Sequence, residues 1–248
     1  MATAWYEDDR FWDDFYPALF HEGRWAVAPE EAASAIGLVG MAPGSELLDF
    51  CCGPGRHSLA FARQGLRVTG VDRTASYLDR ARDRAQKEGL AVEFVEQDVR
   101  QFCRPDAYDF AVSLYTSFGY FEDPSDDRTL LQNVYTSLRP GGRLLMDMTG
   151  KEVVARAFQP RSWSEPEPGL YFLEERRPTK GWEAIDNRWI LLRDGQIREQ
   201  RYRIRIYSGV ELEAVMLSVG FSRVDLFGTL DGAPYDHTAR RLVAVGTK

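Results

Sequence analysis

Two glycines one residue apart, Gly53 and Gly55, follow a carboxylate, Asp49, within the stretch Leu47–Ser58. Glycine has no Cβ, so it reaches positive φ and allows a ligand to lie against the backbone. The helical pattern after Gly55 places unpaired N–H groups beside that loop. With the apolar run before Asp49, this gives a strand, a glycine turn and a helix, which together bind the polar part of a nucleotide-like cofactor. A Gly-x-Gly loop alone also makes an ordinary turn.

A second carboxylate, Asp72, ends the alternating strand pattern 66–72. It lies about 20 residues beyond the glycines, where nucleotide-binding folds bind a ribose diol. NAD-type dehydrogenases and class I methyltransferases, which use S-adenosyl-L-methionine, share this geometry. Ser58 fits the third small residue of the dehydrogenase fingerprint, so it does not separate them. Asp49 would repel a pyrophosphate but suits the ammonium group of a methionine moiety, which favours the second class.

The chain resembles the class I methyltransferases in four motifs that occur in the family's order. The first has the form Asp-x-x-x-Gly-x-Gly. The others are similar to the family's third strand, fourth strand and the turn into the fifth, at 93–99, 108–114 and 138–147. The resemblance covers roughly residues 45 to 150 and again the C-terminal region.

The resemblance implies S-adenosyl-L-methionine as the cofactor and transfers site residues to matching positions. Asp49, Gly53 and Gly55 lie at the methionine end, Asp72 holds the ribose and Arg73 lies beside the adenine. The remaining expected cofactor contacts are Trp12, Tyr16, Cys51, Arg56, His57, Gln97, Asp98, Val99, Leu114, Tyr115 and Phe118.

Aromatic residues are dense in two segments that the resemblance places beside the methyl acceptor. Residues 1–40 carry an aromatic helix face with i, i+4 spacing, which is also typical of a helix packed on the core. Residues 115–121 follow the fourth strand and border the transferred methyl group, or form a buried loop. The expected catalytic residues are Tyr115, Tyr120 and His237, although a base is optional in methyl transfer and His237 is a lone loop histidine.

Composition excludes several kinds of partner and site. The 248 residues carry a net charge of −7, which disfavours nucleic acid. The three cysteines form no disulfide framework and, with the histidines, no metal-ligand spacing, so we expect a reducing compartment and no metal. Residues 1–10 do not resemble a signal peptide, and no apolar run approaches the ~20 residues of a membrane span. We therefore expect a cytoplasmic protein, a monomer or homodimer, with no membrane partner.

The order of strand and helix patterns predicts an α/β fold. We expect a Rossmann-like, seven-stranded, mostly parallel sheet with a terminal antiparallel hairpin, and a small antiparallel β insertion acting as a lid. A helix is expected over 29–39, a loop at 161–163 and three strands over 170–177, 184–193 and 196–207. The predicted parts are a helical cap at 1–44, a cofactor-binding core at 45–150, the insertion at 151–207, and a closing helix and hairpin at 208–248.

The leading functional hypothesis is methyl transfer from S-adenosyl-L-methionine to an N, O or C nucleophile of a small molecule. Methylation of RNA or protein is an alternative that the acidity of the chain disfavours. A third is a non-catalytic protein that retains the cofactor. The sequence alone does not identify the acceptor.

Overall fold

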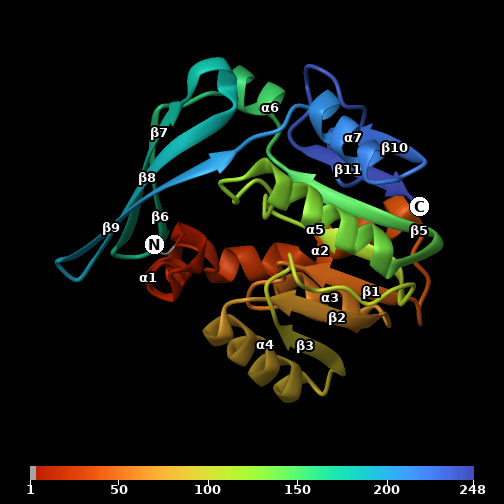
Figure 1. Cartoon of the computed structure of the whole chain (residues 1–248). Helices are drawn as coiled ribbons and strands as arrows, with labels where there is room; N and C mark the ends of the chain where they lie inside the picture. Colours follow the sequence, from red (N-terminus) through yellow and green to blue (C-terminus); the bar gives the residue numbers. More distant parts are fainter. Residues whose placement is uncertain (1–3) are drawn as a thin grey trace.

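A computed structural model describes residues 4–248, so the first three residues of the stretch 1–10 lie outside the description. Seven strands form the main sheet (Figure 1): β1 (Glu46–Phe50), β2 (Arg67–Asp72), β3 (Val92–Glu96), β4 (Tyr108–Ser113), β5 (Leu138–Met148), β10 (Arg223–Phe227) and β11 (Leu242–Thr247). Their order is β10-β11-β5-β4-β1-β2-β3. The five strands β1 to β5 run parallel to their neighbours among themselves. β11 is antiparallel to both of its neighbours, β10 and β5. The predicted sheet with its terminal antiparallel hairpin is confirmed.

Helices cover both faces of the main sheet. The helices of the described residues are η1 (Trp5–Glu7), α1 (Asp9–Leu19), α2 (Glu22–Val39), α3 (Arg56–Arg63), α4 (Ala75–Glu88), α5 (Pro124–Ser137), α6 (Lys151–Arg156), η2 (Lys180–Trp182) and α7 (Gly209–Ser218), of which α1 and η2 belong to the insertion. Successive strand residues point to opposite faces. Leu47 therefore packs with α2 and α3, and Leu48 packs with α5 and α7. Burial on both faces explains why the central strands read as apolar runs.

The helix predicted over 29–39 begins earlier, at Glu22, so Pro29 lies inside α2. A proline removes one backbone hydrogen bond. Ala28, Ala32 and Ala35 are buried on the face that packs against α3, and tertiary packing of such a face supplies most of a helix's stability. The helix ends where Gly40 takes φ 70°.

The insertion is a separate antiparallel sheet in the order β6-β7-β8-β9, with β6 (Arg161–Glu167), β7 (Leu170–Pro178), β8 (Ala184–Arg193) and β9 (Gln196–Arg205). The loop predicted at 161–163 is wrong, because this segment is the edge strand β6. Pro166 is tolerated there because it lies where the pairing with β7 shifts register, on an edge strand. α6 before it was not predicted.

Helix α1 joins the insertion rather than the main sheet. Phe11 and Phe15 share a buried core with Phe172 and Leu191 of the second sheet. The i, i+4 aromatic spacing at the N-terminus thus does form a buried helix face. Figure 1 shows α1 next to the insertion strands, beside the end of the main sheet.

None of the helices within residues 4–248 combines the length and apolar character needed to cross a membrane.

Candidate active site

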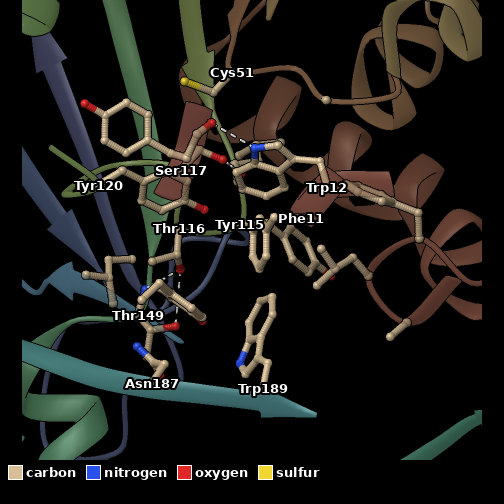
Figure 2. A pocket seen from close by; sticks show the side chains of 18 of the residues that line it. Phe11, Trp12, Cys51, Tyr115, Thr116, Ser117, Tyr120, Thr149, Asn187 and Trp189 are labelled. Carbon is tan, nitrogen blue, oxygen red and sulfur yellow. Dashed lines mark hydrogen bonds between the residues drawn. The ribbon is translucent and has the colours of Figure 1, made fainter. Parts of the chain in front are cut away.

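One large cavity, of about 730 Å³, lies where the parallel strands end. Its walls come from the carboxyl ends of β1, β2 and β4, from α1 and from the second sheet. Figure 2 shows Phe11 and Trp12 of α1, Tyr115 and Thr116 after β4, and Trp189 of β8 around it. Its volume is within the range of small-ligand sites, and strand ends are where open α/β sheets bind ligands.

Most of the residues expected at the site line this cavity. They are Trp12, Asp49, Cys51, Gly53, Arg56, His57, Asp72, Arg73, Gln97, Asp98, Val99, Leu114, Tyr115 and Tyr120. Their roles stay predictions, but the fold brings them to one place from segments more than 100 residues apart.

Four expected residues lie elsewhere. Tyr16 packs against Phe20 and Tyr77. A Cβ on Gly55 would come within 2.9 Å of the Ala81 side chain, so this glycine allows α3 and α4 to pack closely. Phe118 is buried in the core. His237 lines a second, smaller cavity with Tyr235 and Glu152, and the structure thereby separates it from the strand ends.

The glycine loop is fastened to the carboxylate at the end of β2. Gly53 has φ +56°, and its N–H donates to Asp72 Oδ2 at 2.8 Å. The N–H of Thr74 donates to Asp72 Oδ1 at 2.9 Å. Burial raises the pKa of Asp72 despite these bonds. Each carboxylate oxygen retains a lone pair for a ligand hydroxyl.

Asp49 is the most deeply buried carboxyl in the cavity wall. Ser58 Oγ donates to its Oδ2 at 2.5 Å, and no salt bridge reaches it within residues 4–248. Burial, with a smaller contribution from the charge of Asp72, raises the pKa of Asp49 to about 7. Such a group becomes a carboxylate more readily when a ligand places a cation beside it.

Glu31 of α2, which the sequence analysis did not single out, binds three residues at the cavity wall. His57 Nε2 lies 2.8 Å from its Oε2, Arg56 Nη1 lies 3.2 Å from the same oxygen, and the Tyr115 hydroxyl donates to Oε1 at 2.5 Å. Burial opposes ionisation, but these bonds and charges outweigh it and lower the pKa of Glu31 to about 2. Burial lowers the pKa of His57, which favours the neutral form of its imidazole, although the hydrogen bond to Glu31 acts in the opposite direction.

Tyr115 and Thr116 both adopt left-handed backbone conformations, with φ +66° and +62°. Such conformations are costly for side chains other than glycine and persist only where neighbours enforce them. Asp147 accepts hydrogen bonds from both backbone N–H groups, through Oδ2 for Tyr115 and through its carbonyl for Thr116. Arg241 holds the Asp147 carboxylate with two bonds of 2.7 and 2.8 Å.

Two arginines near the predicted adenine end make protein contacts. Arg100, not predicted, binds both oxygens of Asp98, and its hydrogen bonds outweigh burial and lower the pKa of Asp98. Arg73 donates to the Tyr6 carbonyl at 2.9 Å and to Asp9 at 3.0 Å. Arg73 therefore fastens the N-terminal segment over the cavity, a role that the sequence did not indicate.

The side of the cavity opposite the strand ends is aromatic. Trp5 lies between Tyr120 and Tyr202, with ring centroids 4.8 and 4.6 Å from its own. Trp12, Trp189 and the amide of Asn187 complete this wall (Figure 2). We call these six residues the aromatic wall.

Two cavity residues missed by sequence reasoning carry polar groups without protein partners among residues 4–248. The imidazole of His21, at the start of α2, makes no hydrogen bond within residues 4–248, and burial followed by the charge of Arg24 lowers its pKa. The Arg24 guanidinium forms no salt bridge and lies over the Tyr115 ring at 5.1 Å. Neither residue follows a strand, so motif spacing gave no signal for it. In the same part of the chain, no three His, Cys, Asp or Glu side chains are grouped to hold a metal ion.

Comparison with known proteins agrees with this architecture. Residues 47–142 match the family described as a methyltransferase domain. The ubiquinone biosynthesis O-methyltransferase of Coxiella burnetii is 30% identical over 115 residues, 46% of this chain and 48% of that protein. The chain covers between 48% and 61% of the length of the first curated relatives that it matches.

Two solved structures share the fold over most of both chains. The CcbJ methyltransferase from Streptomyces caelestis has a TM-score of 0.78 at 19% identity, covering 88% of this chain and 89% of that one. CalS10, an amino pentose methyltransferase from Micromonospora echinaspora with S-adenosylmethionine bound, has a TM-score of 0.68 at 23% identity, covering 94% and 95%. At these identities, the likeness concerns the fold.

The dehydrogenase alternative shares the glycine loop and Asp72, but it accounts neither for the antiparallel β11 inserted beside β5 nor for the domain match. With the four motifs in order, residues 47–142 match a methyltransferase domain, and the chain shares its fold with solved S-adenosylmethionine-dependent methyltransferases.

Proposed function

We propose that this protein transfers a methyl group from S-adenosyl-L-methionine to an amine of a small polar molecule. The observation that carries the proposal is a single cavity with two unlike sides. Strand-end carboxylates form one side and the aromatic wall forms the other. A cofactor and an acceptor held on these two sides would meet inside one enclosed space.

The strand-end side fits the functional groups of the cofactor. Asp49, which is buried and forms no salt bridge with any residue from Ala4 onward, suits the ammonium group, and the guanidinium of Arg24 suits the carboxylate. Asp72 has lone pairs left for the ribose hydroxyls. Asp98 and Val99 line the part of the cavity that would take the adenine.

When bound, the cofactor supplies a methyl group on a positively charged sulfur. The protein aligns donor and acceptor and excludes water. This alignment raises the effective molarity of the acceptor beside the methyl group, and it requires no dedicated base. The Tyr115 hydroxyl donates to Glu31, so in this structure Tyr115 presents its ring rather than a free hydroxyl. Burial raises the pKa of Tyr120, so its hydroxyl stays protonated and acts as a hydrogen-bond donor.

The aromatic wall favours an amine over an alcohol. Trp5, Trp12 and Tyr202 line the cavity, and aromatic rings attract a positively charged amine and the ammonium product. An alcohol would require strong base catalysis, whereas an amine needs only to reach its neutral form. The amino pentose methyltransferase among the structural neighbours is consistent with this choice.

His21 is our proposed acceptor for the amine proton. Its imidazole lines the cavity, and because its pKa is lowered it is neutral near pH 7 and can receive a proton. His57 is committed to Glu31 and His237 lies in another cavity.

Two alternatives stay weaker. An RNA or protein acceptor would require a basic surface, but the arginines of the second sheet are mostly paired with carboxylates, as in Arg188 with Glu175 and Glu199. A non-catalytic cofactor-binding protein would have no need of the aromatic wall.

Calorimetric titration with S-adenosyl-L-methionine, S-adenosyl-L-homocysteine and NAD tests the cofactor assignment. We expect micromolar binding of the two sulfur compounds, lost in Asp72→Ala and kept in the control Asp225→Ala, whose carboxylate lies on the surface beside Arg223. Tight NAD binding without a response to either sulfur compound would refute the assignment.

The acceptor class is tested by incubating protein and cofactor with panels of small amines, phenols and carboxylates. Mass spectrometry reports the gain of one methyl group. Methylation confined to amines, with a lower kcat and a shifted acidic limb of the pH profile in His21→Gln, would support the proposal. Methylation of phenols alone would contradict it.

A further inference from the structure

The face of the second sheet that points away from the cavity is apolar over half of its area. We call this half the outer patch; it comprises Trp163, Tyr171, Leu173, Ile190, Leu192 and Ile197. Pairing registers place them side by side: Trp163 opposite Leu173, Leu173 opposite Ile190, Tyr171 opposite Leu192, and Leu192 opposite Ile197.

The outer patch is open to solvent in the single chain. Trp163 is 69% exposed, Ile197 62% and Tyr171 42%. Single exposed apolar residues are ordinary, but three exposed ones beside the half-buried Leu173, Ile190 and Leu192 on one sheet face mark an interaction surface. The alternate residues on the same strands, such as Phe172 and Leu191, are buried against α1, so α1 does not cover the outer patch.

The other half of this outer face carries charges of both signs in adjacent rows. Glu175 binds Arg161 and Arg188, Glu199 binds Arg188 and Arg201, and Asp186 binds Arg203. Four arginines face three carboxylates here, and Arg177 lies in the row of Asp186, so this half carries a small net positive charge and does not suit a strongly charged partner. A surface that mixes both signs can pair with a rotated copy of itself, arginine to glutamate.

We propose that this whole outer face, with the outer patch and the charged half together, is the dimer interface and that its occupant is the same face on a second copy of this chain. A two-fold axis makes a surface face itself, so the apolar half of one sheet meets the apolar half of the other. Two sheets then pack face to face at about 10 Å, as in β-sandwiches.

The size of the face agrees with this occupant. Four strands spaced by about 4.8 Å, with some nine residues of about 3.3 Å each, give a planar area of roughly 600 Å² before side-chain relief is added. A stable interface takes about 800 Å² of accessible surface from each partner. The opposite face of the same sheet lines the active-site cavity, so the dimer would stiffen the acceptor wall.

Light scattering, measured as the protein elutes from a size-exclusion column at several micromolar concentrations, tests the proposal. We expect the mass of two chains for the natural sequence and of one chain for Trp163→Glu combined with Ile197→Glu. Val210→Glu is the matched control, because Val210 is 73% exposed but lies on α7, outside the second sheet. It should keep the two-chain mass.

Two results would overturn the proposal: one-chain mass for the natural sequence, or two-chain mass for a folded double variant. Circular dichroism and cofactor titration establish folding. Because the double variant can fail to fold, Ile197→Lys alone gives a second test, since it alters only one position beside the Asp194–Gly195 turn. A Ile197→Lys protein that remains a dimer at every concentration would count against the interface.

Discussion

At the scale of single residues, the cavity wall combines groups whose burial, charge or backbone conformation is energetically unfavourable without a ligand. Asp49 is buried with one hydrogen bond, Arg24 lacks a salt bridge within residues 4–248, and Tyr115 is held in a left-handed conformation. Binding sites often retain residues with such unfavourable free-energy contributions, because the ligand or the surrounding fold compensates for them.

The raised pKa of Asp49 predicts a pH-dependent cofactor affinity. Its carboxyl is protonated below a pKa of about 7, and only the carboxylate attracts an ammonium group. Affinity should therefore rise as pH increases from about 5.5 to about 7.5, by up to about tenfold per pH unit below the pKa. The same raised pKa makes the free protein lose stability as pH rises from 3.8 toward about 7.

Calorimetry with S-adenosyl-L-homocysteine at several pH values measures the affinity. Asp49→Asn should bind more weakly and with a flat pH profile, while Asp225→Asn keeps the natural slope. An unchanged slope in Asp49→Asn would show that another group titrates.

Alanine variants of Gly53 and Gly40 distinguish the cost of backbone strain from the loss of space for the ligand. Both have positive φ, but a Cβ on Gly53 points into the cavity region near Phe20, at 3.5 Å, whereas one on Gly40 meets nothing within 4 Å. Alanine at either position should cost about 1 kcal/mol of unfolding free energy, because left-handed φ disfavours a side chain. Only Gly53→Ala should also weaken cofactor binding.

Urea unfolding and calorimetry on the two variants give the two readouts. Equal cofactor affinity in both variants would indicate that Gly53 serves the turn and not the ligand.

At the scale of elements, strand ends are held to one another through side chains. Asp147 of β5 braces the turn after β4, and Arg241, just before β11, binds Asp147. Glu31 of α2 holds the start of α3 and the same turn. In this way two helices of one layer, α2 and α3, and the strand ends of β4, β5 and β11 fix Tyr115 in the cavity wall.

Arg241→Met should destabilise the protein through this brace. Asp147 is only 3% exposed, so removal of its partner leaves a buried charge and costs about 2–3 kcal/mol, reduced from the fully buried case because Arg241 is part-exposed. Arg223→Met removes an exposed bond to Asp225 and should cost less than about 0.5 kcal/mol. Urea unfolding compares the two. Equal small losses would mean that the brace contributes little.

At the scale of the whole molecule, the cavity is closed by a helix that docks on the ribose-binding segment. Arg73 donates to the Tyr6 carbonyl, Tyr77 donates to the Trp12 carbonyl at 2.6 Å, and Ser76 donates to Asp13. These donors directly follow Asp72. Cofactor binding at Asp72 and docking of α1 therefore depend on the same few residues.

Hydrogen exchange should reveal this coupling. With S-adenosyl-L-homocysteine bound, amides of α1 should exchange more slowly, whereas those of α7, which packs elsewhere on the main sheet, should change little. Arg73→Met should reduce the protection of α1. Equal protection of both helices would indicate general stabilisation rather than a specific coupling.

Most of the main sheet and the strand-end part of the site could be predicted from the sequence, because both depend on residues close together in the chain. Apolar runs ending in carboxylates fixed the strands and placed Asp49, Asp72 and Asp98 at one edge, because parallel strands share their direction. The closing helix expected from residue 208 begins there as α7, and both hydrogen bonds of a capping box between Ser208 and Glu211 form at its start.

Tertiary structure decided what depends on contacts between distant segments. Pro29 lies inside α2 because packing on α3 outweighs local propensity, and residues 161–163 pair as a strand only because β7 is beside them. Arg24, His21 and Glu31 enter the site because α1 and α2 fold across the strand ends, which no spacing within the chain records. His237, although it follows a strand of the same sheet, is carried into a different cavity by its own loop.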